Sequence, residues 1–175
     1  MYLLDTNVLS DFRKPRPHPG LMAWAEVYLA DGLVISLATV VEIVLGAAWI
    51  GQRDLNREAE FRTWLNDVIA APNTTVLPSD MNESIILGQM AATPSLRGFF
   101  DNDRSSARPP KLGSDVRIAA AAIANNCTLV TRDISDMLRI NDHFPLPGLV
   151  DPYTGIQYLG VASMPRQLSL ALTGR

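Results

Sequence analysis

Short apolar runs recur along the sequence, and each is followed by polar residues and then by a stretch with helical spacing. Apolar runs of this length, bounded by turn-forming residues, are typical of strands that are buried on both faces of a parallel sheet. They lie at residues 2–4, 33–36, 75–77 and 128–130, and residues 149–150 are a candidate for a fifth. The pattern predicts an α/β domain with a central, mostly parallel β-sheet of four to five strands and helices on both faces.

The stretches between the runs predict the helices and the limits of the domain. Residues 101–111 are polar and aperiodic, which indicates a loop that leaves the domain. We expect a single domain over residues 1–152 and an extension, residues 153–175, for which the sequence indicates no role. The predicted helices cover residues 8–13, 20–30, 39–50, 54–71, 79–92 and 114–124, with a short helix or turn at 133–140.

Composition excludes several classes of protein. Hydrophobic residues make up 47% of the chain and charged residues 19%, which is unlike a disordered or collagen-like sequence. The formal charge of -3 argues against a protein that coats nucleic acid through bulk positive charge. The single cysteine, Cys127, permits no internal disulfide. Because we find neither a signal-like N-terminus nor an apolar run long enough to span a membrane, we expect a cytoplasmic protein with no membrane association.

Four acidic residues lie where the chain leaves a predicted strand or enters a predicted helix. Asp5 closes the first run, and Asp133 follows the fourth. Glu42 comes about one turn after the second run, and Asp115 opens an alanine-rich helix. A parallel sheet delivers its strand ends to one edge, where ligands usually bind. These four acids are therefore the candidate site residues.

Each acid also has a purely structural interpretation. Asp5 can cap the helix that begins near it, and Glu42 can complete a capping box that starts at Thr39. Asp115 and Asp133 suit the positive ends of helices. However, Glu42 and Asp115 adjoin long apolar stretches that draw them toward the interior, where carboxylates repel one another. A divalent cation would relieve that repulsion, and oxygen ligands without a cysteine cluster suit Mg²⁺ or Mn²⁺.

Four segments together resemble the PIN-domain ribonucleases, and most closely the VapC-type toxins of bacterial toxin–antitoxin pairs. They are residues 2–10 (YLLDTNVLS), 41–46 (VEIVLG), 115–122 (DVRIAAAA) and 129–133 (LVTRD). The resemblance spans about residues 1–152. It implies a PIN-like nuclease domain that cleaves RNA in the cytoplasm, forms a homodimer, and is held inactive by a cognate antitoxin whose tail covers an acidic pocket.

The resemblance also implies roles for individual residues. The acids that bind Mg²⁺ or Mn²⁺ and carry catalysis would be Asp5, Glu42, Asp115 and Asp133. Thr6 and Asn7 would orient the first acid and contact water and substrate. Relatives often have asparagine in place of Asp133 and an acid three residues later, here Asp136, so either of these two is a candidate for the fourth ligand.

Basic residues near the acids are needed because an acidic pocket repels RNA. For each of them, a solvated surface charge is the alternative interpretation. The candidates for phosphate contacts are Arg13, Lys14, Arg16, Arg117 and Arg132.

Two other functions are open. A metal-dependent phosphatase of the haloacid dehalogenase type also has an aspartate after its first strand, but it usually has a second aspartate two residues later, where this chain has Asn7. A non-catalytic PIN-like module that binds RNA or a partner protein would not need the acids, and all four are present.

Overall fold

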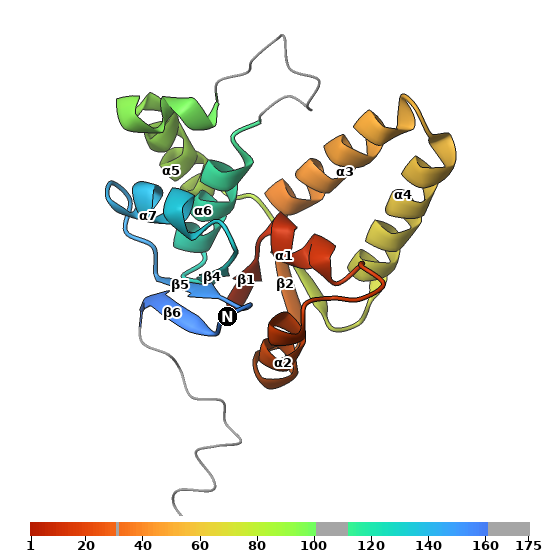
Figure 1. Cartoon of the computed structure of the whole chain (residues 1–175). Coiled ribbons are helices and arrows are strands. Elements are labelled where there is room, and N and C mark those ends of the chain that lie inside the picture. Colours follow the sequence, from red (N-terminus) through yellow and green to blue (C-terminus); the bar gives the residue numbers. More distant parts are fainter. Residues whose placement is uncertain (31, 101–111, 161–175) are drawn as a thin grey trace, which may run out of the picture.

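The computed structural model describes residues 1–30, 32–100 and 112–160, and its centre is a six-stranded sheet in the order β3-β2-β1-β4-β5-β6 (Figure 1). The first five strands pair in parallel, and β6 runs antiparallel to β5 at one edge. The mostly parallel sheet is confirmed, with one strand more than expected. The strands are β1 (Tyr2–Leu4), β2 (Leu33–Ser36), β3 (Thr74–Leu77), β4 (Thr128–Val130), β5 (Gly148–Asp151) and β6 (Ile156–Leu159).

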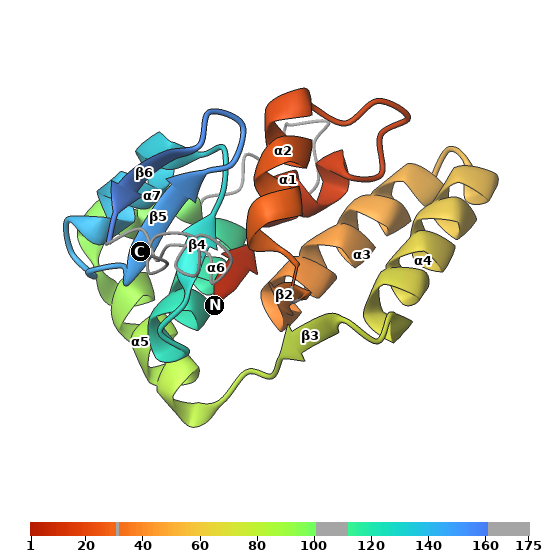
Figure 2. The same cartoon turned by 90° about the horizontal axis from the view of Figure 1, so that it is seen from below.

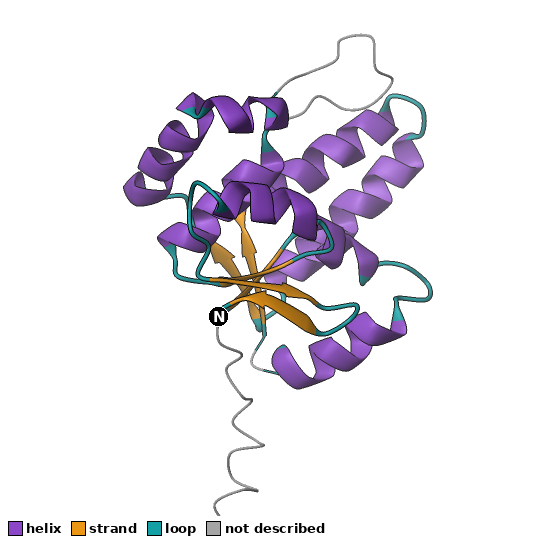
Figure 3. Cartoon of the chain, turned by 60° about the vertical axis from the view of Figure 1, so that its left-hand side comes forward, coloured by secondary structure: helices purple, strands orange, loops and turns teal. Residues whose placement is uncertain are grey.

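Helices connect the strands and cover both faces of the sheet, as predicted (Figure 3). They are α1 (Thr6–Asp11), α2 (Pro19–Tyr28), α3 (Leu37–Gly51), α4 (Leu55–Ala70), α5 (Met81–Ala92), the 3-10 helix η1 (Pro94–Phe99), α6 (Ser114–Ala124) and α7 (Ile134–Asn141). α5, α6 and α7 pack on one face, and α1, α2 and α4 on the other. Figure 2 shows α3 and α4 side by side. Within the described ranges, no helix is both long and apolar enough to cross a membrane.

Neighbouring residues of the central strands belong to two different cores. Leu3 and Leu129 face the core beneath α5, α6 and α7. Leu4 and Val130 face the core beneath α1 and α2. Successive side chains of a strand point to opposite faces, and all four of these are 0% exposed. Burial on both faces is the reason why these runs are apolar throughout instead of alternating.

The sheet continues past residue 152, into the segment that we expected to be an extension. Asp151 shapes the turn after β5, because its carboxylate accepts the Tyr153 N–H at 2.8 Å and the Thr154 hydroxyl at 2.9 Å. Residues of β6 alternate between exposed and half-buried, which is the pattern of an edge strand. The sequence around β6 has no continuous apolar run, so the pattern that predicts buried strands does not predict this one. The predicted loop at 101–111 and residues 161–175 lie outside the described residues.

The order in which the chain adds strands to the sheet reverses at β1. From β1 the chain proceeds outward through β2 and β3, then returns to β4 on the other side of β1 and continues to β5. Open α/β sheets bind their ligands in the crevice between the carboxyl ends of the two strands at such a reversal, which here are β1 and β4. Asp5 directly follows β1, and Asp133 follows β4, so both acids lie at this crevice.

Candidate active site

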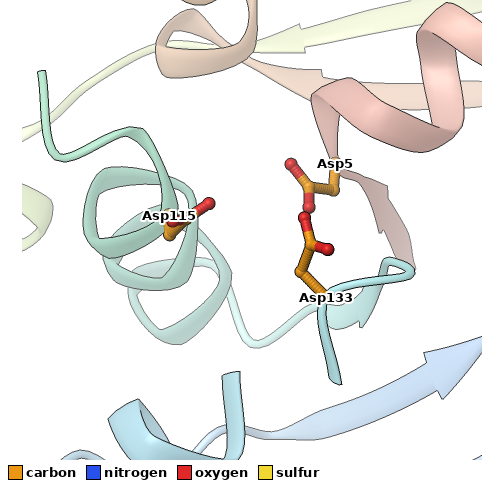
Figure 4. Close-up of side chains that lie close together, drawn as sticks. All are labelled: Asp5, Asp115 and Asp133. Atoms are coloured by element: carbon orange, nitrogen blue, oxygen red, sulfur yellow. The ribbon is translucent and has the colours of Figure 1, made fainter. Parts of the chain in front are cut away.

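Three aspartates from distant parts of the chain meet at the carboxyl edge of the sheet (Figure 4). Asp5 precedes α1, Asp133 precedes α7, and Asp115 lies in the first turn of α6. One carboxylate oxygen of each lies within 4.8 Å of those of the other two. Asp5 is 3% exposed, whereas Asp115 is half-buried and Asp133 is exposed. The cluster therefore extends from the interior to the surface.

The structural interpretations of these acids are only partly correct. Asp5 does cap α1, because its carboxylate accepts the Thr6 N–H at 2.6 Å. Glu42 completes no capping box, since α3 begins at Leu37 and its cap is Ser36. Asp115 lies in the first turn of α6 and Asp133 immediately precedes α7, so both lie at the positive ends of helices as predicted, although the Asp133 side chain makes no capping hydrogen bond. Helix capping thus does not explain the positions of the Glu42 and Asp133 carboxylates.

Asn7 and Thr131 hold the carboxylates of Asp5 and Asp133 together. The Asn7 side-chain amide donates to Oδ2 of Asp5 at 2.8 Å and to Oδ2 of Asp133 at 2.9 Å. The Thr131 hydroxyl donates to the same Asp5 oxygen at 2.6 Å and accepts the Asp133 N–H at 3.0 Å. One amide and one hydroxyl therefore fix the relative positions of two acids that lie far apart in the sequence.

Thr131 is a site residue that our sequence reasoning missed. It is 0% exposed and joins Asp5, Asn7 and Asp133. A sequence signal was present, because Thr131 lies directly between the buried run of β4 and the acid. A threonine at the end of a strand is common for reasons of β-propensity, however, so the sequence did not distinguish its role.

Thr6 connects Glu42 to the cluster. Its hydroxyl donates to Oε2 of Glu42 at 2.6 Å, while its backbone N–H is the one that Asp5 caps. Glu42 is not among the three acids that lie within 4.8 Å of one another, but it lines the same cavity as Asp115. The structure thus brings all four predicted acids to one place, with Glu42 at the margin.

Burial raises the pKa of the Asp5 carboxyl from 3.8 to about 7. The hydrogen bond from Thr131 lowers this pKa, whereas the negative charges of Asp115 and Glu42 raise it. Ionised Asp5 is therefore disfavoured by its removal from water and by two neighbouring carboxylates. A bound cation would reverse the balance, because an opposite charge nearby stabilises the ionised form.

The donor atoms of the cluster suit a hard divalent cation. All three are carboxylate oxygens. Neither histidine takes part, since His18 packs on Tyr153 and His143 is hydrogen-bonded to Ser95. Cys127 is buried in the core. Oxygen ligands of this kind fit Mg²⁺ or Mn²⁺ better than zinc.

A cavity of about 540 Å³ adjoins the acids. Glu42, Asp115 and Asp136 are its acidic residues, and Arg139 is also in its wall. This volume lies within the usual range for ligand pockets. The larger apolar residues of the lining are Ile43, Leu45, Ile50, Phe61, Phe99 and Leu112.

Asp133 and Asp136 occupy different places. Asp133 belongs to the cluster of three, whereas Asp136 lines the cavity and lies 3.6 Å from the guanidinium of Arg139. The geometry therefore favours Asp133 as the partner of Asp5 and Asp115.

The basic residues named from the sequence mostly have other partners. Arg13 is paired with Glu60 and lies 3.8 Å above the Phe61 ring. Lys14 is paired with Asp11. Arg16 is exposed in the loop after α1, and Arg117 is half-buried on α6.

Arg132 contacts the acid network through its backbone. Its N–H donates to Oδ1 of Asn7 at 3.3 Å, which orients the Asn7 amide so that its Nδ2 faces the carboxylates. Its guanidinium lies 4.7 Å above the Tyr153 ring.

A carboxylate cluster at the edge of a parallel sheet is the kind of site that metal-dependent enzymes of phosphate chemistry use. Residues 2–141 match the PIN domain family, and the chain therefore belongs to that family. The VapC ribonuclease Y4jK of Sinorhizobium fredii is 29% identical over 136 residues, which are 77% of this chain and 89% of the relative. The toxin FitB of Neisseria gonorrhoeae is 27% identical over 135 residues, which are 76% of this chain and 88% of the relative.

Solved structures agree with this assignment. The FitAcB structure from Neisseria gonorrhoeae superposes with a TM-score of 0.62 at 25% identity and covers 87% of this chain and 99% of that chain. The VapBC-1 structure from nontypeable Haemophilus influenzae gives a TM-score of 0.53 at 26% identity and covers 81% and 92%. The PIN-like fold and the VapC-type resemblance are confirmed.

The pKa of Asp5 predicts how the stability of the metal-free protein depends on pH. Because the folded-state pKa is about 7 and the unfolded value is 3.8, the folded state binds more protons between these values. In EDTA, the free energy of unfolding should therefore rise as the pH falls from about 8 to about 5, by at most about 1.4 kcal/mol per pH unit from this group. Urea unfolding at a series of pH values measures it.

Asp5→Asn is the control for this measurement. The variant lacks the titrating group, so the difference in stability between wild type and variant isolates Asp5 from the histidines, which both proteins share. Burial raises the pKa of Asp11, but the hydrogen bond and the charge of Lys14 outweigh it and lower this pKa below 3.8. Asp11 therefore affects stability only below about pH 4, which is outside the pH range of this measurement. A difference that stays constant with pH would contradict the assignment.

Proposed function

We propose that this protein is a metal-dependent endoribonuclease and the toxin of a toxin–antitoxin pair. The observation that carries the proposal is the meeting of Asp5, Asp115 and Asp133 within 4.8 Å of one another at the edge of a PIN fold. The names of its relatives, a VapC ribonuclease and a toxin, support RNA as the substrate and toxicity as the outcome.

Asp5, Asp115 and Asp133 would hold a Mg²⁺ or Mn²⁺ ion, with Glu42 as a further ligand at the margin. Two observations support this fit: the all-carboxylate donor set and the disfavoured charge of buried Asp5. Such an ion, when bound, stabilises negative charge on a phosphate and lowers the pKa of a bound water.

The protein's own contribution is to fix the carboxylates before substrate arrives. Asn7 and Thr131 hold Asp5 and Asp133 in place, so no side chain has to be reoriented during the reaction. Thr6 donates to Oε2 of Glu42, which fixes the Glu42 carboxylate beside the residue that follows Asp5. The cavity beside these groups would receive the RNA strand.

The alternatives from the sequence have less support. Membership of the PIN domain family argues against a haloacid dehalogenase phosphatase. Where such a phosphatase usually has a second aspartate, two positions after the first, this chain has Asn7. The Asn7 amide donates hydrogen bonds to Asp5 and Asp133 and adds no negative charge. A non-catalytic module would have no need to keep a buried carboxylate whose pKa is raised to about 7.

RNA cleavage should depend on the acids and on the metal. We expect purified protein to cleave total RNA in Mg²⁺ or Mn²⁺ but not in EDTA. Asp5→Asn and Asp115→Asn should each reduce the rate at least about 100-fold, because losing a ligand removes several kcal/mol of transition-state stabilisation. Gel electrophoresis and end mapping of the products measure this.

Asp67→Asn on the exposed side of α4 is the matched control, because it removes an equal charge away from the acids. It should cleave as wild type does. Equal cleavage by wild type and Asp5→Asn would refute the catalytic proposal, as would the absence of cleavage with both structured and single-stranded RNA in either metal.

Thr131 should support metal binding through its hydroxyl. Thr131→Val keeps the shape of the side chain but removes the donor to Asp5 and the acceptor for Asp133, so we expect the affinity for Mn²⁺ to fall about 10- to 100-fold. Thr131→Ser retains the hydroxyl and should remain within a few-fold of wild type. Isothermal titration calorimetry decides between these results, and equal affinity in the two variants would show that the hydroxyl is dispensable.

The proposed setting is the cytoplasm, with an antitoxin as regulator and a homodimer as the working form. The antitoxin is supported by the solved structures FitAcB and VapBC-1, to which the chain is similar, whereas the cytoplasm and the homodimer are expectations from the sequence. We expect expression of the chain alone to stop bacterial growth and Asp115→Asn to relieve the arrest. Co-expression of a small protein encoded beside its gene should also relieve it and should yield a co-purifying complex. Normal growth with full-length active protein present would contradict the toxin assignment.

A further inference from the structure

Arg139 lines the cavity that also contains Glu42 and Asp115. Within the described part of the chain it is the one basic residue in this lining. It lies on α7, which is anchored in the core through Met137 and Ile140, so the position of its backbone is fixed. Sequence reasoning did not select Arg139, which lies in the segment 133–140 that we expected to be a short helix or turn.

Three contacts hold the guanidinium in one orientation. Nη2 donates to the Ser95 carbonyl oxygen at 3.1 Å, and Nη1 lies 3.6 Å from Oδ1 of Asp136. The Cζ atom lies 4.9 Å above the ring of Phe99, which is itself buried. A guanidinium has five N–H groups, so these contacts leave donors for a ligand. With 55% of its side chain exposed, Arg139 is both fixed and accessible.

The lining of the cavity contains two kinds of residue. Glu42, Asp115 and Asp136 are acidic, and Phe61 and Leu112 are among the apolar residues. A nucleotide has the complementary pair of groups, since its phosphate is anionic and its base presents an apolar face that stacks on aromatic rings or on guanidinium planes.

We propose that Arg139 binds an RNA phosphate next to the one that is cleaved, and that apolar residues of the lining contact the base of that nucleotide. This inference rests on the proposed function, because it takes the acids as the place of cleavage. A fixed guanidinium offsets the repulsion between the acids and the RNA backbone.

The test is RNA binding in an Asp5→Asn background, in which the RNA should not be cut. The probe is a fluorescein-labelled single-stranded RNA oligonucleotide of fixed mixed sequence, with Mg²⁺ constant and KCl varied. Arg139→Ala should raise the Kd about tenfold and reduce the slope of log affinity against log salt by about 0.7, the value for one phosphate contact on a single strand. Arg139→Lys should retain the slope, because it keeps the charge.

Arg62→Ala is the matched control, since Arg62 also pairs with an acid on its own helix but lies on α4, outside the cavity. It should change neither the Kd nor the slope. The proposal is overturned if Arg139→Ala behaves like Arg62→Ala, or if it weakens binding without changing the slope, which would indicate a structural role. Loss of antitoxin binding with unchanged RNA binding would overturn it as well and assign the cavity to the protein partner.

These outcomes separate this inference from the proposed function. If wild type cleaves RNA and Arg139→Ala binds the probe as tightly as its parent, only the inference fails. If wild type cleaves no RNA but binds the probe through Arg139, the nuclease proposal fails while the phosphate contact stands.

Discussion

A carboxylate removed from water at the end of the central strand is the constraint on which the site depends. Asp5 is 3% exposed, and Asp115 and Glu42 add negative charge nearby. Such a group destabilises the fold unless hydrogen bonds or a cation compensate it. Backbone and side-chain donors from Thr6, Asn7 and Thr131 provide part of that compensation. These hydrogen bonds do not fully stabilise the ionised form, because the pKa of Asp5 is still raised to about 7. The incomplete stabilisation is the electrostatic reason to expect a cation.

The order of the strands in the sheet is sufficient to bring the acids together. β1 and β4 are neighbours, so residues just beyond their carboxyl ends must be close. α6 precedes β4 and runs in the opposite direction to it, so the first turn of α6 lies at the carboxyl edge of the sheet. This turn carries Asp115. Asp5 thus meets Asp115 and Asp133, which lie more than 100 residues later in the chain, because of strand order and helix direction alone.

This logic explains what the sequence could reveal. The acids Asp5 and Asp133 were predictable because strand ends share an edge, a rule that needs no side-chain detail. The roles of Thr131 and Arg139 were not, because each depends on which neighbour its side chain meets in space: a buried carboxylate in one case and the ring of Phe99 in the other. β6 was missed for a different reason, since an edge strand lacks the apolar run that burial on two faces imposes.

The graded exposure of the three aspartates has its own physical logic. Mg²⁺ gives up its water reluctantly and usually keeps several water ligands, so a site closed on all sides would not suit it. Buried Asp5 can set the position of an ion, while exposed Asp133 and half-buried Asp115 leave one side of the cluster open to solvent and to substrate. If all three were exposed, nothing would enforce their approach against mutual repulsion. If all three were buried, water and a phosphate would have no access to the ion. The gradient from interior to surface satisfies both requirements in one cluster.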